Sequence, residues 1–327
     1  MLVPKLRFKE FNNNWNNEKI SNAFALSSGS TPNTKQRFFY TGNINWVSSG
    51  ELKRKYIVDT INKVSNIAIE KNNLKIYDIG TLLIAIYGLE ASGVRGTCSI
   101  LNIKATISQA CMALESKNNI SNEFMYYWYQ KNGQWIGLRI AQGTKQQNLT
   151  AELIGNLEVE YPSIDEQEKI VNFLSLLDKK IELQKQKIEA LKIYKRGLIN
   201  KIFNIQYNNT LRLKDLIKEK SIRNKENIVK EVYSVNNKCG FILQAEQFKD
   251  REVASEDTSN YKIVQYNDFA YNPARINVGS IARMKKYNKG IISPMYICFS
   301  CREKLLPEYL EYYYNSEVFR HEMTKRL

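Results

Sequence analysis

Apolar residues recur at steps of four and three along the middle of the chain, and this spacing predicts one long helix from 163 to 203. The seam has ten positions: Ile170, Leu174, Leu177, Ile181, Gln184, Ile188, Leu191, Lys195, Leu198 and Ile202. All of them except Gln184 and Lys195 are apolar. Pro162 ends any upstream element, and Ser163 and Glu166 stand at capping-box spacing. A helix from 165 to 203 is roughly 58 Å long, more than one globular domain needs. We therefore expect the seam to face another helix, in this chain or in a partner.

The rest of the helix surface distinguishes a paired rod from a helix buried in a large core. Eight basic residues face only Glu182 and Glu189 there: Lys179, Lys180, Lys185, Lys187, Lys192, Lys195, Arg196 and Lys201. Such a surface is too highly charged to be enclosed on all sides. We predict helix pairing through the apolar seam residues Ile170, Leu174, Leu177, Ile181, Ile188, Leu191, Leu198 and Ile202.

Shorter patterns on the N-terminal side of this helix are typical of a mixed fold. Apolar or aromatic runs predict strands and loops at 38–40, 45–50, 67–69, 82–87, 98–101 and 107–114. The segment from 124 to 130 and beyond predicts a helix, and 153–161 a strand or an extended lead-in to the long helix. Residues 141–149 read as a polar loop. The pattern indicates the α+β class.

The segment after the long helix repeats the pattern of the segment before it, at an offset of 185 residues. The corresponding positions are Tyr309, Tyr312 and Tyr313 with Phe124, Tyr127 and Trp128, and Ile292–Ser293 with Ile107–Ser108. In addition, 211–216 resembles 18–23, and Asp268 follows a tyrosine-containing turn as Asp78 does. The repeat is one of pattern, because few residues are identical.

This repeat predicts two mixed α/β domains joined by a long helix of coiled-coil character. We place the domains at 1–150 and 208–327 and the helical spacer at 151–207. Carried to its end, the repeat stops before a second copy of the 143–148 loop and of the long helix. On this interpretation the second domain is incomplete.

The composition indicates which class of partner the chain binds. The net charge is +15, from 48 basic and 33 acidic residues, which indicates a polyanionic partner such as nucleic acid. The five cysteines are odd in number and scattered, so we expect free thiols in a reducing compartment and a cytoplasmic location. The sequence contains no run of about 18 apolar residues, so we predict no membrane span. The N-terminus is not that of a signal peptide.

Catalytic chemistry is poorly supported. His321 is the only histidine, which excludes a His-dependent triad and a multi-His metal site. Glu51-Leu-Lys53 and Asn272-Pro-Ala-Arg275 are interpreted as turns, and no Gly-rich phosphate loop is present. Cys298 and Cys301 are interpreted as a thiol pair on a strand. We predict no catalytic residue, no metal and no cofactor.

Binding residues are better supported, because polar side chains gather in loops of both halves. The candidate DNA contacts in the first half are Ser30, Thr31, Asn43, Asn45, Trp46, Ser48, Ser49, Tyr87, Arg95, Lys145, Gln146 and Gln147. Those in the second half are Gln244, Asn272, Arg275, Asn277 and Ser280. Arg reads guanine, Asn and Gln read adenine, and Ser or Thr binds phosphate. Any one of these can equally be an ordinary polar loop residue, and Trp46 is better explained as core.

Several motifs together resemble those of the DNA-specificity (S) subunits of type I restriction–modification systems. They are Pro4-Lys-Leu-Arg-Phe8 with Trp15, Gly29-Ser-Thr-Pro32, Trp46-Val-Ser-Ser-Gly-Glu-Leu52, Gly143-Thr-Lys-Gln-Gln-Asn-Leu149, Pro162-Ser-Ile-Asp-Glu-Gln-Glu-Lys-Ile170, Phe173-Leu-Ser-Leu-Leu-Asp178 and Lys195-Arg-Gly-Leu198. The Pro-x-x-x-Glu-Gln-x-x-Ile element before a Lys-rich helix is the most specific. The resemblance covers the whole chain and is clearest over 1–203.

The resemblance implies two target-recognition domains that each read one half of a bipartite double-stranded DNA site. Two antiparallel helices hold them apart, which suits half-sites about one DNA turn, roughly 34 Å, apart. Such a subunit is not itself an enzyme. It recruits methyltransferase (M) subunits, which methylate adenine using S-adenosylmethionine, and restriction (R) subunits, which cut unmethylated DNA.

The chain departs from this family pattern by carrying one such helix instead of two. Three outcomes follow: a truncated or silent cassette, a seam covered by M subunits, or a homodimer that pairs antiparallel through 165–203 and reads a palindromic site. Pairing or capping by a partner is favoured over a free monomer, because the apolar seam is otherwise exposed. A coiled-coil adaptor with non-specific DNA affinity is the alternative from another functional class.

Overall fold

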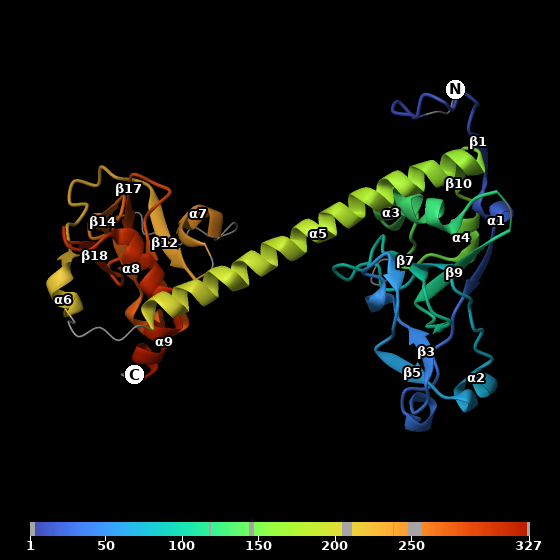
Figure 1. Ribbon diagram of the computed structural model, residues 1–327, viewed down its shortest axis with the longest axis horizontal. Helices are drawn as coiled ribbons and strands as arrows, with labels where there is room; N and C mark the ends of the chain where they lie inside the picture. Colours follow the sequence, from blue (N-terminus) through green and yellow to red (C-terminus); the bar gives the residue numbers. More distant parts are fainter. Residues whose placement is uncertain are drawn as a thin grey trace. The chain divides into compact units, whose positions relative to one another are not determined.

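The computed structural model describes residues 4–117, 119–143, 147–204, 211–237, 239–247 and 257–325. The chain divides into two compact units, Met1–Glu182 and Leu183–Leu327. The boundary falls inside α5, Ile164–Phe203, which is a single helix of 40 residues as predicted (Figure 1). No helix within the described ranges is long and apolar enough to cross a membrane.

The first unit is built around a five-stranded sheet in the order β2-β9-β6-β7-β4. Its strands are β2 Phe24–Ser28, β9 Cys111–Ser116, β6 Leu82–Ala85, β7 Cys98–Leu101 and β4 Tyr56–Ile57. A three-stranded sheet contains β5 Asn62–Val64, β3 Ile44–Val47 and β8 Thr106–Ile107, and a two-stranded one contains β1 Asn16–Lys19 and β10 Glu158–Tyr161. The helices are α1 Ile20–Ala23, η1 Arg37–Tyr40, η2 Ser49–Glu51, α2 Asn66–Asn72, α3 Asn122–Arg139 and α4 Ala151–Gly155.

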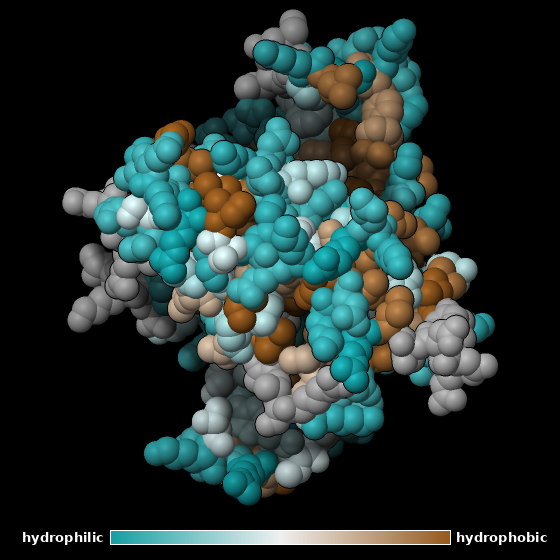
Figure 2. Space-filling view, turned by 90° about the vertical axis from the view of Figure 1, so that its left-hand side faces the viewer, coloured by the Kyte–Doolittle hydropathy of each residue, from teal (hydrophilic) through white to brown (hydrophobic). Residues whose placement is uncertain are grey.

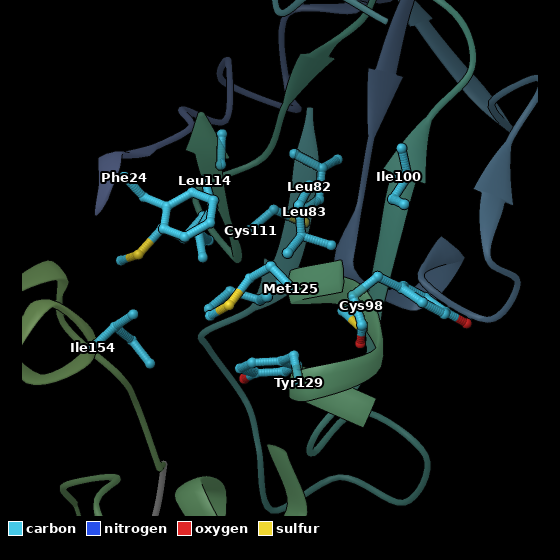
Figure 3. Close-up of a cluster of buried hydrophobic side chains, with 14 of the residues drawn as sticks. Phe24, Leu82, Leu83, Cys98, Ile100, Cys111, Leu114, Met125, Tyr129 and Ile154 are labelled. Carbon is cyan, nitrogen blue, oxygen red and sulfur yellow. The ribbon is translucent and has the colours of Figure 1, made fainter. Parts of the chain in front are cut away.

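The core of this unit lies between the five-stranded sheet and α3. All four residues of β6 and of β7 are buried, which explains why these strands are almost uninterrupted apolar runs. Met125 and Tyr129 extend from α3 toward Leu83 and Cys98 on the sheet (Figure 3). Burial raises the pKa of the Cys98 thiol to about 12. All five cysteines are free thiols.

The first turn of α5 is locked into the same unit. Glu166 and Gln167 are 1% and 0% exposed. Arg7 donates two hydrogen bonds of 2.7 Å to the Glu166 carboxylate, and the Trp15 indole donates a third at 3.4 Å. The predicted capping box is therefore wrong. Ser163 does precede the helix, but the Glu166 carboxylate accepts hydrogen bonds from Arg7 and Trp15. A buried carboxylate needs such partners to remain charged.

The second unit contains two four-stranded sheets. Their orders are β11-β18-β15-β16 and β13-β12-β17-β14. The strands are β11 Ile217–Lys220, β12 Val232–Asn236, β13 Gly240–Leu243, β14 Lys262–Gln265, β15 Phe269–Tyr271, β16 Ile281–Arg283, β17 Lys289–Ile292 and β18 Ile297–Cys301. The helices are α6 Leu213–Leu216, α7 Gln244–Gln247, η3 Pro273–Val278, α8 Pro307–Tyr314 and α9 Glu317–Thr324.

The strand pairing confirms the internal repeat. In each unit a four-residue helix leads into a strand, β2 or β11, that pairs antiparallel with β9 or β18. The next strand across the sheet is β6 in the first unit and β15 in the second, followed by β7 and β16. The parallel pairs correspond as well: Val47 lies opposite Ile107 and Tyr233 lies opposite Ile292. Ile292 keeps the offset of 185 from Ile107, whereas Tyr233 is shifted by one further residue from Val47. The two aspartates differ: Asp78 is exposed, whereas Asp268 is buried and paired with Lys220.

Some local predictions were wrong. Residues 67–69 lie in α2 and 38–40 in η1 rather than in strands. The Ser65 side chain caps α2 by accepting from the Ala68 N–H, and Asn73 ends the helix in the left-handed conformation. These local caps outweigh the β preference of Ile67 and Ile69. The 153–161 segment divides into the end of α4 and β10.

Gly29 tests the close packing at the end of β2. Its N–H donates to the Cys111 carbonyl, and a Cβ at this position would lie 2.0 Å from the Ile107 carbonyl oxygen. We expect Gly29→Ala to lower the free energy of unfolding by about 1–3 kcal/mol, because backbone rather than a flexible side chain must move. The measurement is urea denaturation of the full chain. Gly50→Ala is the control, since nothing lies within 4 Å of its Cβ position, and equal stability of both variants would contradict this packing.

Candidate nucleic-acid interface

One end of the five-stranded sheet collects most of the predicted contact residues of the first unit. Strand β9 runs antiparallel to both β2 and β6, so Ser28, Ala85 and Cys111 end at the same edge. Because β7 is antiparallel to β6, Cys98 begins at that edge as well. The loops 29–32, 86–97 and 108–110 therefore converge there. We call this end of the sheet the first loop edge.

Backbone hydrogen bonds tie these loops together. Ser30 N–H donates to the Ile107 carbonyl, and Ile86 N–H donates to the Ala110 carbonyl. The Gln109 N–H donates to the Thr31 hydroxyl at 3.3 Å. The 147–149 segment joins through the Leu149 N–H, which donates to the Ile86 carbonyl. The predicted residues Ser30 and Thr31 thus lie in a supported surface, next to loops far away in the sequence.

Three predicted residues meet at this edge: Tyr87, Arg95 and Gln147. Arg95 Nη2 donates to Gln147 Oε1 at 2.7 Å, while Arg95 Nε is buried and lacks a hydrogen-bond partner within the described ranges. The Gln147 N–H donates to the Glu90 carboxylate at 2.9 Å, which lowers the pKa of Glu90. Tyr87 keeps 38% of its surface exposed. The arrangement offers a phenol, an amide and a guanidinium that already has one partner.

The Trp46–Glu51 segment has a different role. Trp46 is 7% exposed and donates its indole N–H to the Ser30 carbonyl, so it supports the edge from the core. The Ser48 N–H and hydroxyl both donate to Glu51 Oε2 at 2.8 Å, and Ile61 N–H donates to Glu51 Oε1. The Glu51 carboxylate therefore holds Ser48 at the start of η2, whereas no such bond engages the Ser49 side chain in this part of the structure.

Two further predicted residues lie on β3 or just before it. Asn45 Nδ2 donates to the Lys104 carbonyl, and Asn45 Oδ1 accepts from the Thr60 hydroxyl. Asn43 is exposed. Lys145 and Gln146 lie outside the described residues. The predictions for DNA contact at these positions stay predictions.

The second unit presents an equivalent edge. Tyr271, Ile281 and Ile297 lie at one end of the β11-β18-β15-β16 sheet, so the 272–280 loop corresponds to 86–97. Asn272 caps η3 by accepting from the Ala274 N–H, and Ser280 is buried. Arg275 is exposed. Only the backbone of Asn277 is described. We call this end the second loop edge.

A cavity of about 670 Å³ borders the second loop edge. It lies among the 236–241 turn, η3, β16 and α9. Arg283 and Lys285 in its wall pair with Glu308 and Glu311. Lys286 and Arg320 also line it and form no ion pair within the described ranges. Their charges suit a phosphate group.

The surface in this region is mostly polar. Figure 2 shows hydrophilic side chains over much of the face in view, with hydrophobic patches between them. Polar, wet surfaces are typical of protein–DNA interfaces. Among the described residues, no group of three His, Cys, Asp or Glu side chains is placed to hold a metal ion.

The sequence reasoning missed several members of the first loop edge. Gln109, Glu90 and Asn148 bind neighbouring loops there. Gln109 fell inside the predicted strand at 107–114, which the structure divides into β8 and β9 with Gln109 in the turn between them. Glu90 joins the edge through its carboxylate, which accepts from the Gln147 N–H, and Asn148 joins it through a β-bridge to Tyr87. A single sequence carries no signal for such contacts between distant loops.

Comparison with known proteins identifies a family. The family model described as "Type I restriction modification DNA specificity domain" matches residues 12–193. A specificity subunit of the type I restriction enzyme MjaIX from Methanocaldococcus jannaschii is 27% identical over 284 residues, covering 78% of this chain and 64% of that protein. The specificity subunit of EcoR124I/EcoR124II from Escherichia coli is 23% identical over 176 residues, covering 53% and 43%. The chain thus spans less than two thirds of these relatives.

Solved structures share the fold. The S subunit of the type I restriction–modification system from M. genitalium superimposes with a TM-score of 0.55 at 15% identity, over 99% of this chain and 82% of that one. A chain from a structure of type I system assembly gives 0.56 at 12% identity, over 94% and 80%. The structural likeness and the match over more than half of the sequence agree, and the chain belongs to the family of type I restriction–modification DNA specificity proteins.

Proposed function

We propose that this chain reads a bipartite double-stranded DNA target as the specificity subunit of a type I restriction–modification complex. The observation that carries the proposal is the duplicated sheet. The same strand order brings polar loops to one edge in both units, so each unit offers an equivalent surface to one half-site. The net charge of +15 favours a polyanion.

The chemistry in this proposal belongs to partner subunits. Methyltransferase subunits methylate adenine within the target, and restriction subunits cut DNA that lacks the mark. This chain supplies the position at which they act, in the cytoplasm where the DNA lies. Family membership supports these partners.

The exposed seam of α5 supports a helical partner. Ile170 packs against the core of the first unit. The later seam residues are 41–55% exposed: Leu177, Ile181, Ile188, Leu191, Leu198 and Ile202. Apolar rows of this kind are normally covered. Lysines such as Lys185 and Lys192 flank the row, so an acidic helix of a methyltransferase subunit suits it better than a second copy of this chain.

Methylation mapping tests the function directly. The chain is co-expressed with methyltransferase subunits of its own system in a host that lacks adenine methylation, and modified adenines are read by single-molecule sequencing. We expect an asymmetric bipartite motif. A palindromic motif would instead indicate paired copies that use the first unit. No methylation, with folded protein and bound partner confirmed, would overturn the proposal and favour the silent cassette.

A second test concerns the second loop edge. Arg275→Ala should weaken binding to the target duplex by about tenfold and reduce the preference for target over scrambled DNA, because an exposed guanidinium at this edge suits bases or phosphates. The assay is fluorescence anisotropy at fixed salt. Lys304→Ala removes the same charge beyond the opposite end of β18 and serves as control. Equal effects of the two variants would favour a non-specific adaptor.

A third test concerns the seam. The Ile188→Glu, Leu191→Glu double variant should abolish association through α5, because two carboxylates would be buried in an apolar contact. Size-exclusion chromatography with light scattering is run on the chain alone and with methyltransferase subunits. Gln186→Glu, an exposed change on the same helix, is the control. Unchanged association of the double variant would exclude the seam as the contact.

A further inference from the structure

A lysine of the first unit connects three elements at the point where α5 leaves it. Lys55 precedes β4, and its side chain is 13% exposed. Its ammonium lies 2.6 Å from a Glu123 carboxylate oxygen on α3 and donates to Ser175 Oγ on α5 at 2.9 Å. It also lies 4.7 Å from the centroid of the Tyr127 ring and donates to the Tyr127 hydroxyl at 3.3 Å.

The hydroxyl of Tyr127 completes the connection to α5. It donates to Asp178 Oδ2 at 2.7 Å and lies 3.1 Å from Ser175 Oγ. Hydrogen bonds and ion pairs of this kind are directional, so they fix the orientation of a helix as well as its contact. Removing the cation takes the ion-pair partner from Glu123, whose other oxygen accepts from the Tyr56 hydroxyl.

Lys55 stays charged in this setting. Its burial opposes the charge, but the hydrogen bonds and charges of Glu123 and Tyr127 outweigh burial and raise the pKa of Lys55. The Lys55 ammonium therefore remains charged throughout the physiological pH range.

The second unit holds α5 by different means. At the repeat offset, Tyr312 corresponds to Tyr127 and Glu308 to Glu123. Lys195 of α5 lies 5.3 Å from the centroid of the Tyr312 ring, and Phe203 packs on Tyr309 and Tyr313. Glu308 pairs with Arg283 of its own unit. Among the described residues of this sheet, β16 is the edge strand and has no neighbour equivalent to β4. In addition, the Glu317 N–H donates to Asn200 Oδ1 of α5 at 3.0 Å. Ring contacts and one hydrogen bond tolerate small rotations that the denser network of the first unit does not.

We propose that Lys55, with Glu123, Tyr127 and Asp178, is an orientation clamp for α5, and that the clamp sets which spacer length between DNA half-sites is accepted. The proposal rests on the proposed reading of a bipartite target. Together, the buried Glu166 anchor and the clamp hold α5 at two points about 18 Å apart along the helix, which determines its direction.

The length of α5 beyond the clamp determines how far a change in helix orientation displaces its far end. From Asp178 to Phe203 the helix extends for about 38 Å. A tilt of about 10° at the clamp moves its far end by about 7 Å, and DNA rises 3.4 Å, roughly, per base pair. A loosened clamp thus corresponds to about two base pairs of spacer.

The test compares Lys55→Met with a matched control, Lys75→Met. Lys75 pairs with Glu115 and lies over the Tyr77 ring, so it has the same chemistry in the same unit away from α5. Each variant is assayed by methylation of DNA that carries fixed half-sites and spacers of different length. We expect Lys55→Met to recognise the same half-site bases as the wild type. Its discrimination against spacers that are one or two base pairs too long or too short should fall by about tenfold. Lys75→Met should behave as wild type.

A second readout does not depend on DNA. Spin labels at Lys131 on α3 and Lys187 on α5, in a Cys239→Ser background, report the orientation of α5 by double electron–electron resonance. Lys55→Met should broaden the distance distribution, and Lys75→Met should not. A narrow distribution and an unchanged spacer preference in folded Lys55→Met would overturn the clamp. A broadened distribution in a chain that reads no DNA would retain the clamp and reject the proposed function.

Discussion

The burial of the Glu166 carboxylate is the constraint on which the first unit depends. A charged group that is 1% exposed must be paired, and Arg7 and Trp15 supply the partners from the N-terminal segment. Gln167 next to it accepts from the Ser121 N–H and donates to the carbonyls of Asn119 and Pro162. The start of α5 is thereby joined to the N-terminal segment and to the start of α3. Family motifs that are 150 residues apart in the sequence meet because these buried polar groups must be satisfied.

The strand topology determines where the polar loops of each unit lie. Antiparallel pairing of β9 with β2 and β6 places three loop origins at one edge, and the same order in the second unit repeats the result. Residues of the second unit occupy equivalent positions while sharing few identities with the first. Two equivalent edges with different side chains are what a bipartite, asymmetric target requires of a single chain.

The two units nevertheless differ where they hold α5. The first uses a cation, two carboxylates and a phenol, whereas the second uses aromatic rings and a hydrogen bond from the Glu317 N–H to Asn200. The continuous α3 of the first unit corresponds to two shorter helices, α8 and α9, that meet at Ser316, which caps α9 through the Phe319 N–H. The cavity beside the second loop edge is lined by residues of both helices.

The amino-acid sequence alone determined the long helix, the α+β class, the duplication and the family, because each depends on periodicity or on motifs that are local in the chain. It also placed Tyr87, Arg95 and Gln147 among the candidate contacts. The preference for Trp46 as a core residue was also available from the sequence. Only the tertiary structure decided that Arg95 bonds Gln147, that the Ser48 hydroxyl donates to Glu51 and that Lys55 reaches α5. These roles depend on which distant segments become neighbours, and long-range pairing is set by packing and hydrogen bonding rather than by local sequence.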